Sequence, residues 1–266
     1  MTLVVCDVDG TLVDKHKQLT APTIAAVKRL RVAGVGFTLI SARPMSGMVP
    51  IAEALGLEGP IGAFNGGIVF RRDGTIASRV TVDPVVARGV FDVIGDAAVD
   101  VWVFADDRWY ASTDQGPHVP HERLASNQEP IVRDGFDDLL DHADKIVFVS
   151  DDEGLLRGLA EKAQARFGAD ATIVQSQTYY LDVTAKAANK GDGIAALAQA
   201  LGVPLTHTIA IGDQANDLAM FARAGRAIAM GNATDAVKAK AGDVTTANDA
   251  DGVAHAIDTL ILGRMM

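Results

Sequence analysis

The chain has 266 residues, of which 48% are hydrophobic and 22% are charged, with a formal net charge of −10. This composition is typical of a soluble globular protein with one large domain or two smaller ones. The negative charge disfavours nonspecific binding to nucleic acid or to an anionic membrane. The single cysteine, Cys6, excludes an intrachain disulfide and a thiolate-rich metal site. Without a basic leader or about 20 consecutive apolar residues, we expect a cytoplasmic protein.

A short apolar run opens the chain and ends at Asp7-Val8-Asp9-Gly10-Thr11. An unbroken apolar run of this length is typical of a strand that is buried on both faces of a parallel sheet. Two carboxylates follow where this strand must leave the sheet, and the glycine after them allows the backbone to turn. Because ligands in open α/β sheets bind beyond the carboxyl ends of the strands, we expect a site here. An ordinary acidic turn is the alternative.

The next segments alternate between helix and strand. Apolar spacing and turn residues predict a helix over 21–33, a strand over 36–40, a helix over 45–55 and a strand over 60–64. This alternation is typical of right-handed crossovers and a parallel sheet. A hairpin with strands at 68–70 and 75–78 follows.

The middle of the chain has a different rhythm. We expect helices over 84–94 and 152–167, and strands over 100–105, 109–112, 145–150, 171–176 and 179–184. The stretch 113–144 is polar and lacks periodicity, so it is predicted as a loop. Helix–strand–strand thus occurs twice, which describes a small α+β unit and does not fit a parallel sheet.

Helix–strand alternation resumes after Gly191. We expect helices over 194–201, 216–224, 234–241 and 252–262, and strands over 207–211, 227–230 and 244–246. The predicted fold class is therefore α/β: a Rossmann-like parallel sheet interrupted by an inserted α+β domain. The predicted boundaries are 1–81 with 186–266 for the sheet domain and 82–185 for the insert.

Polar residues gather in four clusters at the ends of predicted core strands or at the start of a helix: Asp7 with Asp9, Ser41, Lys190, and Asp213 with Asp217. The aspartates would repel one another without a cation, and oxygen ligands without His or Cys point to a hard ion such as Mg²⁺. A serine hydroxyl and a lysine ammonium suit phosphate oxygens. The alternatives are a solvated Lys190, a strand-end hydrogen bond for Ser41 and a first-turn acid at Asp217.

In this order the clusters resemble the four motifs of the haloacid dehalogenase (HAD) superfamily of phosphatases. Other segments are similar to its Cof-type subfamily: Ser41-Ala42-Arg43-Pro44, Asn65-Gly66-Gly67, Asn189-Lys190-Gly191, Met230-Gly231-Asn232-Ala233 and Asp251-Gly252-Val253. In that subfamily a cap is inserted between the second and third motifs. The resemblance covers nearly the whole chain and implies a HAD fold, with 82–185 as the substrate-specificity cap.

The resemblance implies a Mg²⁺-dependent phosphatase for a small phosphomonoester, either a sugar phosphate or a phosphorylated cofactor. Asp7 would be the nucleophile that forms an aspartyl-phosphate, and Asp9 would be the general acid and base. Since halide leaves without a proton, the presence of Asp9 favours phosphate-ester chemistry over dehalogenation.

The same resemblance implies the ligands. Mg²⁺ would lie on the side chains of Asp7 and Asp213 and on the backbone carbonyl of Asp9, with Asp217 in the outer shell. The residues implied in phosphate binding are Ser41, Lys190, Gly10 and Asn216, and those that could shape or contact the substrate are Arg43, Asn65 and Gly66.

Two other functions stay open from the sequence. A phosphotransferase or sugar phosphomutase would use the same two aspartates and pass the phosphoryl group to a second hydroxyl instead of water. A non-catalytic binding module on this fold is the other. The presence of Asp7, Lys190 and Asp213 argues against that second alternative.

Overall fold

The structure is a computed structural model that describes residues 1–264. Its chain forms two compact units: the first contains Met1–Ala42, Met48–Ser78 and the chain from Asn189 onward, and the second contains Arg43–Gly47 and Arg79–Ala188. The main chain passes into the second unit at Arg79 and returns at Asn189, whereas the sequence-based boundaries were placed at 82 and 186.

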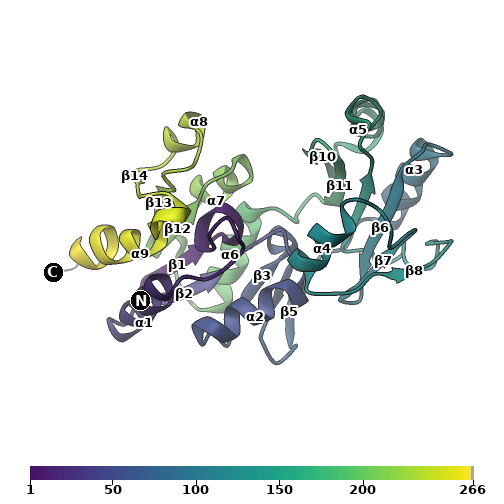
Figure 1. The fold of residues 1–266 in the computed structure, drawn as a ribbon. Coiled ribbons are helices and arrows are strands. Elements are labelled where there is room, and N and C mark those ends of the chain that lie inside the picture. Colours follow the sequence, from purple (N-terminus) through teal and green to yellow (C-terminus); the bar gives the residue numbers. More distant parts are fainter. Residues whose placement is uncertain (265–266) are drawn as a thin grey trace. The chain divides into compact units, whose positions relative to one another are not determined.

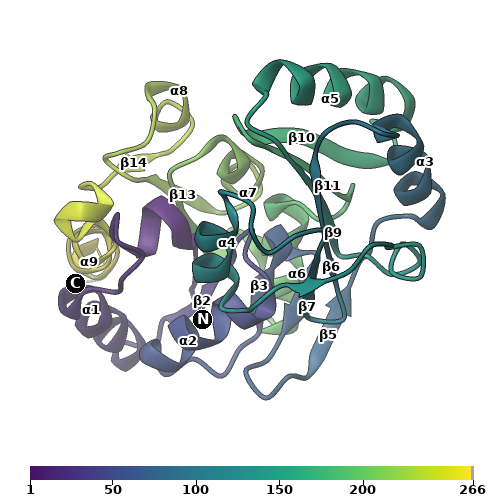
Figure 2. The same ribbon diagram turned by 45° about the vertical axis from the view of Figure 1, so that its right-hand side comes forward.

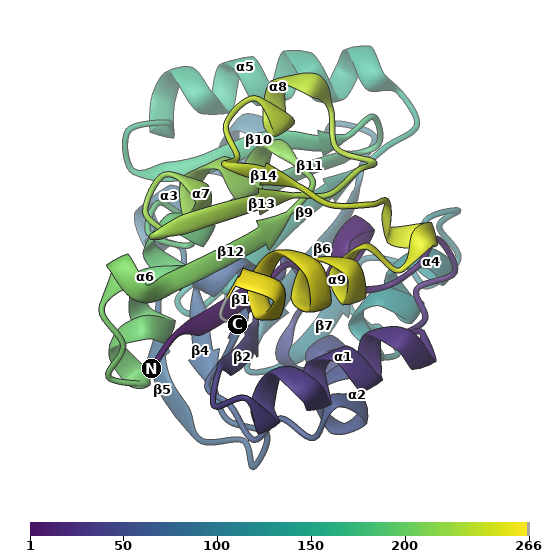
Figure 3. The same cartoon turned by 90° about the vertical axis from the view of Figure 1, so that its left-hand side faces the viewer.

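A five-stranded parallel sheet is the centre of the first unit, and Figure 3 shows its strands side by side. In spatial order the strands are β14 (Asp243–Val244), β13 (Arg226–Ala229), β12 (Thr208–Gly212), β1 (Leu3–Cys6) and β2 (Gly36–Leu39). All four residues of β1 are fully buried, as its apolar run requires. Because β12 lies on one side of β1 and β2 on the other, the chain order reverses at β1.

Helices pack on this sheet. They are α1 (Ala21–Val32), α2 (Met45–Leu55), α6 (Lys190–Ala200), α7 (Leu218–Phe221), α8 (Asp235–Lys238) and α9 (Gly252–His255), which continues as helical turns to Arg264. Figure 3 shows α1 and α9 on the same face of the strands. The hydroxyl of Thr20 accepts a hydrogen bond from the N–H of Thr23 and so caps α1. Within residues 1–264, no helix has the length and apolarity needed to cross a membrane.

The predicted hairpin belongs to a small three-stranded sheet in order β3-β4-β5, formed by Ile61–Ala63, Ile68–Phe70 and Ile76–Arg79. Strands β3 and β4 pair antiparallel, and one parallel bridge joins Ile40 to Gly62. The segment after β2 is therefore held beside β3.

The second unit is a six-stranded sheet with two helices on one face (Figures 1 and 2). Its strands in spatial order are β10 (Ala171–Gln177), β11 (Tyr180–Ala185), β9 (Lys145–Val149), β6 (Asp100–Ala105), β7 (Arg108–Ala111) and β8 (Ile131–Val132). Helices α3 (Pro84–Ile94) and α5 (Glu153–Phe167) bury alternate strand residues such as Val103, Phe148 and Leu181 in one core. The repeated helix–strand–strand pattern predicted from the sequence is confirmed.

The loop predicted over 113–144 is wrong in two places. It contains α4 (Val119–Ser126) and the two-residue strand β8. Only Val119 and Ser126 of α4 are buried, and both residues of β8 are exposed, so neither element leaves an apolar pattern in the sequence. The start of α6 was also placed too late, at 194, because its first turn contains two glycines and polar residues.

The contact between α3 and α5 yields a stability prediction. A Cβ added to Gly89 would lie 2.1 Å from the ring of Phe167, whereas one added to Gly158 would have no atom within 4 Å. We expect Gly89→Ala to lower the free energy of unfolding by about 1–3 kcal/mol through overpacking. We expect Gly158→Ala to raise it by roughly 0.5–1 kcal/mol, because alanine loses less backbone entropy in a helix.

Urea unfolding followed by tryptophan fluorescence measures both variants. The chain has two tryptophans, Trp102 and Trp109, and both are buried in the second unit, so the signal reports that unit. A Gly89→Ala variant as stable as the unmodified protein would show that the α3–α5 contact is looser than described.

Candidate active site

The candidate site lies at the carboxyl ends of β1 and β12. Asp7 follows β1 directly and Asp213 follows β12 directly. Lys190 is the first residue of α6, and Asp217 lies in the short helical turn after β12. The carboxyl ends of parallel strands meet at one edge of the sheet, and in open α/β sheets ligands bind where the strand order reverses, which here is at β1.

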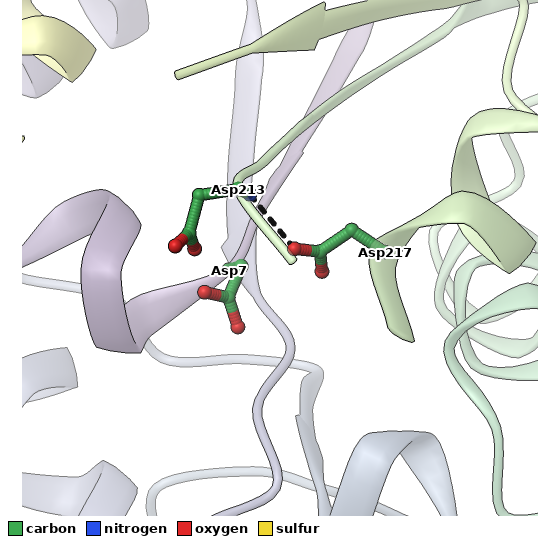
Figure 4. Close-up of side chains that lie close together, drawn as sticks. All are labelled: Asp7, Asp213 and Asp217. Carbon is green, nitrogen blue, oxygen red and sulfur yellow. Dashed lines mark hydrogen bonds between the residues drawn. The ribbon is translucent and has the colours of Figure 1, made fainter. Parts of the chain in front are cut away.

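Three aspartates meet at this edge. Asp7, Asp213 and Asp217 are all buried, and one carboxylate oxygen from each lies within 4.8 Å of the other two. Figure 4 shows the three side chains close together, two from the ends of β1 and β12 and one from the turn beyond. Residues that are far apart in the sequence therefore form one acidic cluster.

Lys190 is the cation of this cluster. Its Nζ contacts Oδ1 of Asp7 and lies 2.6 Å from Oδ1 of Asp217, while its side chain is 1% exposed. Burial opposes the charge of the ammonium, but the two carboxylates outweigh it and raise the pKa of Lys190. The side chain of Asn189 accepts the N–H of Asp192 at 2.9 Å and so fixes the start of α6. The burial of Lys190 excludes the alternative of a solvated lysine.

Hydrogen bonds hold the acids in place. The backbone N–H groups of Asp213 and Gln214 both donate to Oδ2 of Asp217, at 2.8 and 2.9 Å respectively. The hydroxyl of Thr11 donates to Oδ1 of Asp213 at 2.8 Å, and the amide of Gln214 donates to its Oδ2 at 3.1 Å. Asp217 thus binds Lys190 through one oxygen and the backbone through the other.

Asn232 connects two parts of the site. Its Nδ2 donates to the carbonyl of Gly10 at 2.8 Å and to Oδ2 of Asp213 at 3.3 Å. The sequence predicted no individual role for Thr11, Gln214 or Asn232, although Thr11 and Asn232 lie in segments that resemble family motifs. Their roles could not be predicted, because their hydrogen-bond partners are set by the fold.

The cluster has an excess of negative charge. Three carboxylates face one ammonium, and burial raises the pKa of Asp7 to about 7 even though Lys190 lowers it. Burial likewise raises the pKa of Asp213. The neighbouring thiol of Cys6 has a pKa well above its usual value, first because of burial, so it stays protonated. Close, oxygen-only donors that are short of positive charge fit a hard divalent cation such as Mg²⁺.

The turn after β1 separates Asp9 from this cluster. Gly10 has φ of +81°, and a Cβ there would lie 2.4 Å from Oδ2 of Asp213, so both conformation and space require glycine. The carboxylate of Asp9 is not part of the triad of acids. Its Oδ1 lies 2.6 Å from Nζ of Lys17, a residue that sequence reasoning missed.

The other predicted residues are distributed as follows. The N–H of Asn65 donates to the carbonyl of Ser41 at 2.7 Å, and Ser41 is buried beyond the end of β2. Asn65 and Gly66 both have positive φ, of 59° and 90°. Asn216 reaches Oδ1 of Asn65 at 3.5 Å, a long contact. Arg43 is buried in the segment that groups with the second unit.

The lysine at the centre of the cluster yields a second prediction. Lys190→Met would leave buried carboxylates without their ammonium, and we expect it to lower the free energy of unfolding by about 3–5 kcal/mol in a chelating buffer. The matched control is Lys28→Met, because Lys28 is exposed on α1. Urea unfolding followed by circular dichroism measures both. Equal stability of the two variants would contradict the buried ion pairs.

Comparison with known proteins agrees with this geometry. The family model of haloacid dehalogenase-like hydrolases matches residues 4–257. A putative phosphatase of Streptococcus pyogenes serotype M6 is 27% identical over 98% of each chain. The 5-amino-6-(5-phospho-D-ribitylamino)uracil phosphatase YwtE of Bacillus subtilis is 27% identical over 99% of each chain. The crystal structure of a haloacid dehalogenase-like hydrolase from Bacteroides thetaiotaomicron superimposes with a TM-score of 0.89 at 26% identity, over 97% of this chain and 99% of the other. The chain therefore belongs to the haloacid dehalogenase-like hydrolases.

Proposed function

We propose that the protein is a Mg²⁺-dependent phosphatase that hydrolyses a small phosphomonoester through an aspartyl-phosphate on Asp7. The observation that carries the proposal is the buried carboxylate of Asp7, held by Lys190 at a strand end beside two further acids. Membership of the hydrolase family and the phosphatase names of the relatives support it.

The acidic cluster would hold the metal. The side chains of Asp7 and Asp213 and the backbone carbonyl of Asp9 would bind Mg²⁺. Asp217 binds the ammonium of Lys190 through one oxygen and two backbone N–H groups through the other, which suits it to a supporting place in the outer shell. When bound, Mg²⁺ supplies positive charge that offsets the repulsion between an anionic phosphate and the carboxylate of Asp7. This repulsion amounts to roughly 4 kcal/mol per unit-charge pair at about 4 Å and an effective dielectric constant near 20.

Two half-reactions follow from the roles of Asp7 and Asp9. In the first, an oxygen of Asp7 attacks phosphorus, the bond from phosphorus to the ester oxygen breaks, and that oxygen takes a proton from the carboxyl of Asp9. In the second, a water oxygen attacks phosphorus and gives a proton to the carboxylate of Asp9. The bond between Asp7 and phosphorus then breaks and orthophosphate leaves.

The remaining residues would bind the phosphate group and select the substrate. Lys190 would pair with phosphate oxygens as well as with Asp7, and Ser41, Asn216 and the loop at Gly10 would donate hydrogen bonds to them. The second unit would act as the cap that selects the leaving group, with help from Arg43, Asn65 and Gly66. A sugar phosphate or a phosphorylated cofactor is the proposed substrate class, and the ribitylaminouracil phosphate named for one relative is of this kind.

Orthophosphate release from a panel of phosphorylated metabolites tests the function. We expect release with Mg²⁺ for at least one member, and none after chelation of the metal. Asp7→Asn should lower kcat by about three orders of magnitude or more, as loss of a covalent nucleophile does elsewhere. Asp235→Asn, at an exposed position of α8, is the matched control.

Two outcomes would count against the proposal: the same rate for Asp7→Asn as for the control, or no release from any ester. The phosphotransferase alternative gives a different result, because it requires a second hydroxyl compound as acceptor. Release in water without an added acceptor therefore separates hydrolysis from transfer.

A further inference from the structure

The two aspartates after β1 each have their own lysine. Asp7 is buried and bound by Lys190, whereas Asp9 is bound by Lys17 at 2.6 Å between Nζ and Oδ1. The Asp9–Lys17 pair is partly exposed, with side-chain exposures of 32% and 30%. The proposed reaction assigns no role to Lys17.

A tight turn presents Lys17 to Asp9. The carboxylate of Asp14 accepts the N–H groups of His16 and Gln18 at 2.8 and 2.9 Å, and the N–H of Lys17 donates to the carbonyl of Asp14 at 3.0 Å. Lys17 itself has φ of +62°, a left-handed conformation that a residue with a side chain adopts only when its surroundings impose it. Such backbone outliers gather at functional sites.

The turn is also fixed to the rest of the first unit. The amide of Asn248 donates to the carbonyl of Val13 at 3.0 Å, and the N–H of Lys15 donates to Oδ1 of Asp249 at 2.9 Å. The ammonium of Lys15 is 3.7 Å from Asp249 and so forms its ion pair away from Asp9. Lys17 therefore reaches Asp9 from a backbone that is anchored at several points.

We propose that Lys17 is a positioning residue that holds the carboxylate of Asp9 where it exchanges protons with the ester oxygen and with water. The inference rests on the proposed function, because that function gives Asp9 its role. A partly exposed ion pair contributes little to stability, so the contact is better explained by orientation than by folding. A partly exposed aspartate can rotate, and a shift of about 1 Å in a catalytic group can cost on the order of 100-fold in rate.

A substrate whose leaving group needs no proton isolates the effect. In stopped-flow measurements with p-nitrophenyl phosphate, the burst of p-nitrophenolate reports phosphorylation of Asp7, and the steady phase reports hydrolysis of the aspartyl-phosphate. We expect Lys17→Met to leave the burst rate within about twofold and to slow the steady phase by roughly 10- to 100-fold. Lys15→Met is the matched control, with the same change of charge on the same turn, and should match the unmodified protein.

Further variants separate orientation from other roles. Lys17→Arg should restore most of the steady phase, since it keeps a cation that can bind the carboxylate. In the Asp9→Asn background, Lys17→Met should add no further loss, because the two residues act as one unit. Lys17→Gln also removes the ammonium, so it replaces Lys17→Met in the comparison with the unmodified protein if the methionine variant does not fold.

Several results would overturn the inference while leaving the proposed phosphatase activity in place. These are a slower burst with Lys17→Met, a raised KM at unchanged kcat, or losses from Lys17→Met and Asp9→Asn that multiply. Equal losses in Lys15→Met and Lys17→Met would also overturn it, because they would reflect charge alone. Failure of the proposed function looks different: the unmodified protein would release no orthophosphate, or Asp7→Asn would be as active as its control.

Discussion

The contact of Lys190 with Asp7 and Asp217 is the interaction on which the site depends. It joins the end of β1, the start of α6 and the turn after β12, which are separated by 183 and 27 positions in the chain. A buried ion pair of this kind is weak evidence for stability, because well-packed apolar residues of similar volume often do as well or better. A lysine and three carboxylates at a strand end, in place of an apolar core, are therefore best explained by chemistry. The neighbouring hydrogen bonds from Thr11 and the N–H of Gln214 then serve to keep these acids in fixed orientations.

Most of the elements could be predicted from the sequence, because a helix or strand with one buried face has apolar residues at a regular spacing. Helices α2 and α3 begin and end where apolar spacing placed them, at 45–55 and 84–94. The buried strands β1 and β9 are short runs rich in β-branched apolar residues, and that length and composition favour a strand over a helix. What escaped prediction was α4 and β8, which bury too little to show a pattern. Local propensity alone is a weak signal for such elements.

The residues of the candidate site also fall into two groups, those that could be predicted from the sequence and those that could not. Asp7, Lys190, Asp213 and Asp217 could be predicted to meet, because each stands at the edge where parallel strands end. Thr11, Asn232 and Lys17 could not, because common polar residues acquire a role only through their partners. The hydroxyl of Thr11 donates to the carboxylate of Asp213, 202 positions away in the chain. Lys17 reaches Asp9 from a left-handed backbone conformation that its sequence does not predict.

On the proposed function, the environments of Asp7 and Asp9 explain how two carboxylates so close in sequence can differ in their roles. Gly10 turns the backbone at once, so that Asp7 remains in the buried cluster while Asp9 points to a partly exposed lysine. A nucleophile benefits from a buried, fixed position, and a group that exchanges protons with water and an ester must reach solvent and substrate. Separate environments for paired carboxylates are a general way to give them separate roles.

Charge sets the order in which this site can be filled. The chain carries a net charge of −10, and the cluster itself has three carboxylates for one ammonium. Charges beyond about 8–10 Å are largely screened at physiological salt, so the local excess decides whether an anion can approach. The single charge of Lys190 is already shared between Asp7 and Asp217, so the cluster stays negative even when Lys190 also contacts a phosphate oxygen. On the proposed function, a divalent cation must therefore be in place before the phosphoester can be held against Asp7, and substrate affinity should depend on the metal as strongly as turnover does.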